Sequence, residues 1–293
     1  MQPWLDYSGR LSPLKLLVFV ALFLPGGWIA LALASGQLGA DPIKEALHQL
    51  GLWAIRFLLI TLAITPARAI LQWPRVMLVR RMLGVAAFAY AAAHLSLYIV
   101  DEAFDLAKVA SEIALRFYLT IGFVALLGLA ALAATSTDGM VRRLGGRRWQ
   151  RLHRLVYAIV ALGLVHYFIQ AKLIVYEPMV MDGLFLWLMG YRLVAAQRRD
   201  RRVPLAALAA ISLASAALTA LGEAVYYWLK TGVDPSRVLA VNLSLATGIR
   251  PGVVVLAAGT AVTVLAVLRA LQGGRRGTGG RNRRPAPAAV AGE

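Results

Sequence analysis

The 293-residue sequence contains no cysteine. Without thiolates a protein cannot hold an iron–sulfur cluster, a cysteine-type zinc site, a c-type heme attachment or a disulfide. A bound transition metal would therefore depend mainly on the four histidines, which are His48, His94, His153 and His166. The sequence also lacks a P-loop, a dinucleotide-binding glycine fingerprint and a nucleophile elbow in a suitable context. The histidines are thus the main candidates for chemistry.

Charge is the second scarce property. Only 15% of the residues are charged, 60% are hydrophobic and the mean hydropathy is +0.69. A soluble domain has roughly 45–50% apolar and about 25% charged residues. Long stretches, such as 16–33 and 253–268, carry no charge at all. This distribution excludes a soluble globular enzyme and is typical of a membrane protein with several spans.

A bilayer core about 30 Å thick needs about 20 helical residues for each span. Apolar runs bounded by charges, Pro or Gly predict eight spans, at 14–34, 51–66, 82–100, 117–135, 152–169, 179–196, 204–221 and 252–271. The first run ends in Ala32-Leu33-Ala34, like a signal peptide. It exceeds the usual ~7–15-residue apolar region of such a peptide, which favours a retained helix. The sequence therefore predicts an all-α polytopic membrane helix bundle.

The charges that are present are mostly basic and unevenly placed. There are 31 Lys and Arg against 14 Asp and Glu, which gives a net charge of +17. Arginines concentrate at 68–81, 138–154, 192–202 and 269–293, whereas 36–50, 101–116 and 170–182 carry more acids than bases. By the positive-inside rule, both termini are predicted to be cytoplasmic. The Gly-, Arg- and Pro-rich tail at 273–293 is predicted to be disordered and to anchor the topology beside membrane lipid, not to bind nucleic acid.

Two histidines fall at the same predicted depth. His94 lies 13 residues beyond Arg81, and His166 lies 13 residues beyond the histidine at 153, in spans that both run outward from the cytoplasm. At 1.5 Å per residue, each is about 20 Å from the cytoplasmic edge. Two imidazoles at matched depth on separate helices suit the axial ligation of a heme from opposite faces, so both are predicted metal ligands. The alternative is that each is a polar packing residue.

A second group of residues lies near the cytoplasmic edge. Arg80 stands 14 residues before His94, where a second bis-histidine heme would need a ligand, and arginine does not suit iron. The residues predicted to line an anionic, stackable cofactor such as flavin mononucleotide (FMN) are Arg80, Arg81, Trp149, Arg151, His153 and Arg154. Positive-inside charge with an interfacial tryptophan explains the same cluster equally well. On an ideal helix His153 and His166 lie about 140° apart, so they need not serve one pocket.

Five stretches carry a resemblance to a known family. They are 39–44 (Gly-Ala-Asp-Pro-Ile-Lys), 57–66 (Phe-Leu-Leu-Ile-Thr-Leu-Ala-Ile-Thr-Pro), 80–84 (Arg-Arg-Met-Leu-Gly) followed by His94, 135–137 (Thr-Ser-Thr), and 147–157 (Arg-Arg-Trp-Gln-Arg-Leu-His-Arg-Leu-Val-Tyr) followed by His166. On these stretches, residues 10 to 195 resemble the heme-binding membrane subunit of the bacterial periplasmic methionine-sulfoxide reductase system. That subunit lies within the ferric-reductase-like transmembrane superfamily.

The resemblance implies a heme b protein of the bacterial inner membrane that also carries FMN. His94 and His166 would be the heme ligands, and His153 and Arg80 would line the inner cofactor region. Such a protein would take electrons from the quinone pool or a cytoplasmic flavin reductase. It would pass them to a periplasmic molybdopterin-containing methionine-sulfoxide reductase, which carries out the catalysis and repairs oxidised periplasmic proteins. Whether there is one heme or two is left open.

The sequence departs from this family in its C-terminal part. The family core has six spans, so we divide the chain into a heme-binding ferric-reductase-like domain at 1–200, two additional transmembrane helices at 201–272 and the tail. The additional helices are expected to serve packing or assembly, or to contact quinol or a partner. Two rival functions are a ferric or quinone-linked reductase with another acceptor and a proton-coupled transporter. His48 is assigned to an outer loop at the surface, and Arg56 to the outer interface or a heme propionate.

Overall fold

The computed structural model describes residues 3–5, 8–172, 174–200, 202–244 and 248–278. Within these ranges it contains twelve α-helices, one 3-10 helix and no β-strand. The helices are α1 (Pro13–Ala34), α2 (Pro42–Ile70), η1 (Pro74–Val79), α3 (Arg80–Asp101), α4 (Leu106–Leu115), α5 (Phe117–Ala134), α6 (Asp138–Leu144), α7 (Gly146–His153), α8 (Val156–Gln170), α9 (Tyr176–Gln197), α10 (Leu205–Thr231), α11 (Pro235–Leu243) and α12 (Pro251–Thr278). Eight helical segments are long and apolar enough to cross a membrane, which confirms the predicted all-α polytopic bundle.

Several spans differ in detail from the prediction; helix α10, for example, continues to Thr231, ten residues past its predicted end at 221. Helix α2 begins at Pro42 and not at residue 51, because Asp41 stands at the N-cap and proline at the first helical position suits a helix start. The fifth span is broken between α7 and α8. There the amides of Arg154, Leu155 and Tyr157 each bond a carbonyl three residues earlier, so the chain tightens before the α-helix resumes.

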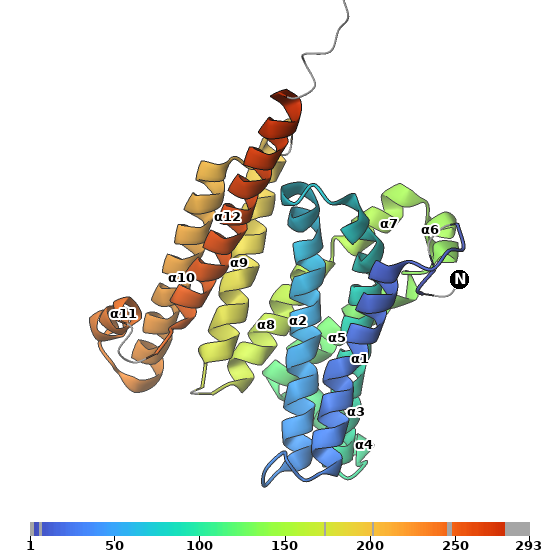
Figure 1. The fold of residues 1–293 in the computed structure, drawn as a ribbon. Helices are drawn as coiled ribbons and strands as arrows, with labels where there is room; N and C mark the ends of the chain where they lie inside the picture. Colours follow the sequence, from blue (N-terminus) through green and yellow to red (C-terminus); the bar gives the residue numbers. More distant parts are fainter. Residues whose placement is uncertain (1–2, 6–7, 173, 201, 245–247, 279–293) are drawn as a thin grey trace, which may run out of the picture.

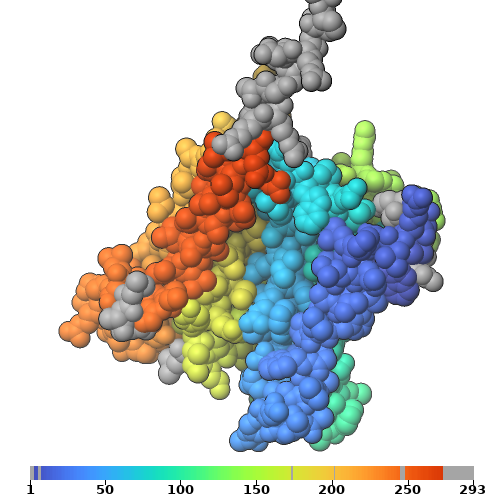
Figure 2. Space-filling model, viewed as in Figure 1, coloured from blue at the N-terminus to red at the C-terminus, as the bar shows by residue number. Residues whose placement is uncertain are grey.

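The bundle has two parts that stand side by side (Figure 1). Helices α10, α11 and α12 stand beside α9, and α1, α2, α3 and α5 stand together, with α8 between the two groups. In the space-filling view α12 and α1 lie on either side of α2 (Figure 2). The connection from α2 to α3, together with α6 and α7, lies at the end of the bundle where α12 also ends, whereas α4 and α11 lie at the opposite end. The arginine-rich connections therefore share one end.

Tyr90 of α3 fastens α1 to the bundle. Its hydroxyl donates to the carbonyl of Leu22 (2.7 Å) and accepts from the amide of Gly26 (2.7 Å). In an undisturbed α-helix these two backbone groups would bond each other, so the hydroxyl is inserted into the helical ladder. The insertion lies beside Pro25, and a Cβ at Gly26 would come within 3.0 Å of the hydroxyl oxygen. Tyr90 lies four residues, or about one helical turn, before His94 on α3.

Arg192 joins α9 to α2. Pro66 lies inside α2 and has no amide hydrogen, so the carbonyl of Leu62, four residues earlier, lacks its helical donor. Arg192 supplies that donor, since its Nη2 lies 2.5 Å from the Leu62 carbonyl oxygen. Its Nη1 donates to the carbonyl of Leu188 at 2.8 Å. An arginine that the sequence places among cytoplasmic charges is therefore a half-buried contact between two helices.

Helix α10 packs closely against both of its neighbours. Cβ atoms at Gly183 of α9 and Gly259 of α12 would overlap the side chains of Thr219 and Ser212 on α10. Small residues at helix contacts allow such close approach inside membranes. Helix α12 continues to Thr278, past the predicted start of the tail at 273, and the rest of the predicted tail, 279–293, lies outside the described residues.

A buried polar cluster joins α10, α11 and the start of α12. Glu223 of α10 is 2% exposed and is paired with Arg250 at the start of α12. The amide of Asn242 on α11 also donates to the Glu223 carboxylate, at 2.9 Å. Three segments are thus tied together by one buried carboxylate.

Candidate functional site

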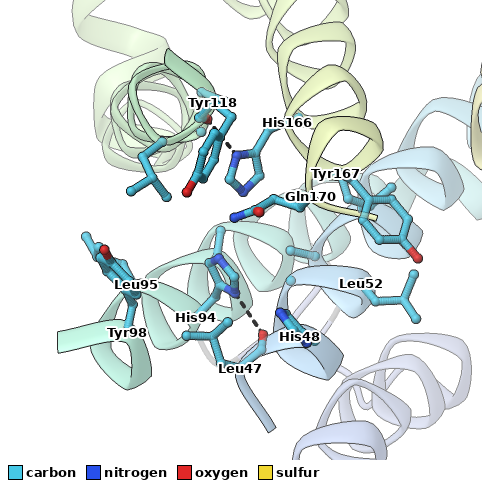
Figure 3. Close-up of a pocket in the computed structure, with 18 of the residues that line it drawn as sticks. Leu47, His48, Leu52, His94, Leu95, Tyr98, Tyr118, His166, Tyr167 and Gln170 are labelled. Atoms are coloured by element: carbon cyan, nitrogen blue, oxygen red, sulfur yellow. Dashed lines mark hydrogen bonds between the residues drawn. The ribbon is translucent and has the colours of Figure 1, made fainter. Parts of the chain in front are cut away.

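His94 and His166 face each other in the core of the bundle (Figure 3). His94 projects from α3 and His166 from α8. Their ring centroids are 6.3 Å apart and their ring planes lie at 82°. The structure therefore brings together the two histidines that the sequence places at one depth.

Backbone carbonyls set the orientation of both rings. Nδ1 of His94 lies 2.8 Å from the carbonyl oxygen of Leu47, and Nδ1 of His166 lies 2.8 Å from that of Tyr118. Since a carbonyl only accepts hydrogen bonds, each Nδ1 carries the proton and each Nε2 keeps a free lone pair. A hydrogen bond of this kind is the common means by which proteins orient a metal-binding imidazole.

Each ring also lies against a glycine. A Cβ at Gly51 of α2 would come within 3.0 Å of the His94 ring, and one at Gly122 of α5 within 2.8 Å of the His166 ring. The contact at Gly122 is closer than real Cβ atoms make, and the one at Gly51 is tighter than usual, so a larger residue would displace the His166 ring and press on the His94 ring. The glycines of α2 and α5 therefore leave room for the two imidazole rings.

The two histidines line a cavity of about 810 Å³, which we call the bis-histidine cavity. Its volume falls within the range of about 300–1,000 Å³ that is usual for cofactor sites. The deep wall is apolar and includes Ile55, Leu58, Ala125, Leu129 and Ile159. Such a wall suits a flat, largely apolar ligand shielded from water.

The spacing of the rings fits a heme held from both faces. An imidazole–metal bond is about 2 Å long, so two imidazoles that held one iron would have ring centroids roughly 6 Å apart. The separation found is 6.3 Å. Among the described residues no group of three His, Cys, Asp or Glu side chains could hold a metal ion. Two protein ligands suit a metal whose macrocycle supplies the others.

The mouth of the bis-histidine cavity is polar. Besides tyrosines, the cavity is lined by one further histidine, His48, and by charged residues, which are Lys44, Glu45, Asp101, Glu102, Glu112, Arg116 and Glu177. His48 lies on α2, so its predicted loop position is wrong, because the helix begins before it. Arg56 does not line the cavity. It pairs with Glu177 at 3.1 Å and stands 4.8 Å above the Trp53 ring.

A second cavity of about 470 Å³ lies toward the arginine-rich end, and we call it the arginine cavity. Five of the six predicted cofactor residues line it, namely Arg80, Arg81, Trp149, His153 and Arg154. Arg151 is exposed and lies outside this wall. The reason is helical geometry, since two residues on from Trp149 the side chain points to the opposite side of α7. Tyr157, which the sequence analysis did not assign to the site, also lines the cavity.

His153 is engaged in a different way from the other two histidines. Its Nε2 lies 3.2 Å from Oγ1 of Thr135, and its ring stacks on Trp149 with centroids 3.9 Å apart. Nε1 of Trp149 donates to the Thr135 carbonyl at 2.9 Å. His153 and Trp149 therefore form a fixed, stacked wall.

An ion pair lies at the edge of the arginine cavity. Arg81 Nη1 lies 2.5 Å from the Asp138 carboxylate, and both side chains are about two-fifths exposed, at 42% and 43%. The hydrogen bond from Arg81, together with its positive charge, holds the pKa of Asp138 below its ordinary value of 3.8. Arg80, in the same wall, makes no ion pair within the described ranges.

The two cavities share a wall. Leu58 of α2 and Leu129 of α5 line both of them. His166 and His153 lie in different cavities, as their angular separation indicates, and the break between α7 and α8 adds to that separation.

Sequence reasoning missed the site features that are backbone groups or glycines. The carbonyls of Leu47 and Tyr118 give no signal, because every residue has one. Gly51 and Gly122 do give a signal. A glycine inside a helix costs about 1 kcal/mol relative to alanine, so its presence in a span points to a close approach.

Residues 50–164 match the family described as ferric reductase like transmembrane component. This segment includes His94 and His153 and ends two residues before His166. No solved structure matches the chain.

The chain is also similar to curated proteins named protein-methionine-sulfoxide reductase heme-binding subunit MsrQ. It is 46% identical over 197 residues to the protein of Rhodospirillum rubrum, which covers 67% of this chain and 92% of that relative. It is 43% identical over 183 residues to that of Caulobacter vibrioides, covering 62% and 87%. It is 36% identical over 221 residues to that of Azospira oryzae, covering 73% and 95%. The chain therefore belongs to the MsrQ family.

Proposed function

We propose that this chain is the heme-binding membrane subunit of a periplasmic methionine-sulfoxide reductase system. It takes electrons from the quinone pool or a cytoplasmic flavin reductase. It delivers them to a periplasmic molybdopterin-containing reductase, which repairs oxidised periplasmic proteins. The observation that carries the proposal is the pair of facing imidazoles, His94 and His166, whose ring spacing fits axial heme ligation. The names of the relatives support both the heme and the partner.

His94 and His166 would hold a heme b, which would supply a one-electron redox couple at its iron. The carbonyls of Leu47 and Tyr118 keep the proton on each Nδ1, so that each Nε2 stays available as a ligand. The apolar wall of the cavity excludes water. Low polarity and the hydrogen bonds to the imidazoles are the means by which the protein would set the reduction potential.

We propose that the arginine cavity binds FMN and that the chain holds one heme. Arg80, Arg81 and Arg154 supply positive charge for a phosphate, and the stack of Trp149 and His153 offers an aromatic surface. A second heme is not favoured, because Nε2 of His153 faces Thr135 and His153 is the only histidine among the described residues that line this cavity.

The proposed setting is the bacterial inner membrane, with both termini in the cytoplasm. The gathering of the arginine-rich connections at one end supports this orientation. We keep the division into a heme-binding domain at 1–200, two additional transmembrane helices at 201–272 and a basic tail at 273–293. The close packing of α10 on α9 and α12 supports a structural role for the additional helices.

The test is spectroscopic. The full chain, purified in detergent, is expected to give a b-type reduced-minus-oxidised spectrum, with one heme per chain by pyridine hemochrome assay and bound FMN by fluorescence. Oxidation of the reduced protein on mixing with the purified catalytic subunit and methionine sulfoxide would support the proposed acceptor. Well-folded protein without any b-type signal would contradict the proposal and favour a transporter.

A further inference from the structure

Tyr157 occupies a position in the arginine cavity that the proposed function does not use. It lines the cavity from α8. Its hydroxyl oxygen accepts a hydrogen bond from Nε of Arg192 at 3.3 Å, and the Arg192 guanidinium lies 5.3 Å from its ring centroid. A phenol has a single proton, and its oxygen is already an acceptor here. No acceptor for that proton is found in the described part of the chain, so it can bond a ligand in the cavity.

Arg192 is fixed by three hydrogen bonds. Besides Tyr157, it donates to the carbonyls of Leu62 on α2 and Leu188 on α9. The first of these carbonyls needs it, because Pro66 supplies no amide hydrogen. The guanidinium makes these three bonds from three separate nitrogens, whereas a lysine would have to donate from a single one. Arg192 does not line the cavity itself, but its hydrogen bond fixes the position of the Tyr157 hydroxyl.

Arg80 has no carboxylate partner among the residues that the structure describes. Arg80 stands in the same wall as Tyr157. Of the arginines that line the cavity, Arg81 alone forms an ion pair within the described part of the chain, with Asp138. Half-buried charges without partners are costly, and an anion would offset that cost.

We propose that Arg80 and Tyr157 bind a phosphate group in the arginine cavity, and that Arg192 is a positioning residue acting through Tyr157. A flavin nucleotide and a lipid headgroup both carry such a phosphate. The identification of the ligand as FMN rests on the proposed function, whereas the anion site rests on the contacts above. Arg192 touches the tyrosine and not the cavity.

The experiment uses the full chain in phosphatidylcholine nanodiscs. Dissociation constants are measured for FMN by fluorescence quenching, for riboflavin by the same method, and for inorganic phosphate by calorimetry. The wild type is expected to prefer FMN over riboflavin. Tyr157→Phe should reduce that preference about tenfold, the scale of one hydrogen bond to a charged group. Arg192→Gln should reduce it in the same direction, and neither variant should change the riboflavin constant. Arg151→Gln is the matched control, which removes a charge at the same end outside the cavity and should change nothing.

The outcomes separate this inference from the proposed function. Equal affinities for FMN and riboflavin, or an equal fall of both in Tyr157→Phe, would overturn the phosphate site while leaving flavin binding intact. Phosphate binding that depends on Tyr157, without FMN binding, would support the site and contradict the flavin. If neither FMN nor phosphate binds, the same test is repeated in nanodiscs that contain phosphatidylglycerol. Lipid occupancy that Tyr157→Phe abolishes would identify a lipid phosphate as the ligand, and no such occupancy would overturn the site.

Discussion

The two cavities of this bundle share a wall but use their histidines in opposite ways. In the bis-histidine cavity, backbone carbonyls bind Nδ1 of His94 and His166, and both Nε2 atoms stay free. In the arginine cavity, Nε2 of His153 faces Thr135 and the ring stacks on Trp149. The nitrogen of each imidazole that is left free therefore distinguishes the two proposed metal ligands from His153, which forms part of a stacked wall.

The two cavities also differ in where their charged residues lie. The deep wall of the bis-histidine cavity is aliphatic, whereas arginines line the other cavity. An apolar macrocycle suits the first, and an anionic ligand the second. Leu58 and Leu129 separate the two cavities. We therefore predict that a substitution in the bis-histidine cavity will mainly affect heme binding, and one in the arginine cavity mainly flavin binding.

The largest effect on heme binding is expected from closing the glycine gap behind a proposed heme ligand. In Gly122→Ala the new Cβ would lie within 2.8 Å of the His166 ring, so the imidazole must move. Loss of ligand orientation typically weakens metal binding about 10–100-fold. Heme titration of the apoprotein measures this. Gly27→Ala is the control, because a Cβ there meets no atom within 4 Å. Equal heme affinity in the two variants would contradict this part of the comparison.

A change that destabilises the packing of α10, α11 and α12 should leave ligand binding in both cavities unchanged. Glu223→Gln leaves Arg250 half-buried without its counter-charge, and breaking a buried pair costs about 3–5 kcal/mol. The free energy of unfolding in mixed micelles should fall by about that amount, while heme and flavin contents per folded chain stay constant. Glu177→Gln, which breaks the more exposed pair with Arg56, should cost less than about 1 kcal/mol. Loss of heme in folded Glu223→Gln would show that the unit is part of the site.

A smaller effect is expected at the joint between α1 and α3. Tyr90→Phe removes the hydroxyl that bridges Leu22 and Gly26, which should lower the free energy of unfolding by about 1 kcal/mol. Tyr227→Phe is the control, since no hydrogen bond of its hydroxyl is found in the described part of the chain. Equal thermal midpoints for the two variants would show that the helical ladder of α1 closes again without cost.

The smallest effect is a pH dependence at the edge of the arginine cavity. Arg81 lowers the folded-state pKa of Asp138 below its ordinary 3.8, so the pair stabilises the fold above that pH and loses its contribution as the pH falls through the folded value. The effect is small because both side chains are exposed to solvent. Asp138→Asn should therefore flatten the fall of the thermal midpoint below about pH 4. Identical profiles for wild type and variant would contradict it.

Much of this architecture could be predicted from residue patterns. Eight apolar runs predict the spans, and the equal spacing of His94 and His166 from the basic edge predicts their meeting, because helical rise is constant. The early start of α2 could not be predicted from hydropathy, since its first turns are polar. The carbonyls that orient the rings belong to Leu47 and Tyr118, whose side chains are irrelevant to that role. The contact of Arg192 with Leu62 depends on tertiary packing that no local pattern encodes.

The central claim is that two histidines bind heme and the third does not. The most direct measurement is the heme and flavin content per folded chain of full-length His166→Ala and His153→Ala, by pyridine hemochrome assay and flavin fluorescence. We predict that His166→Ala loses its heme, whereas His153→Ala keeps its heme and loses flavin. Loss of heme from His153→Ala as complete as from His166→Ala would contradict the account.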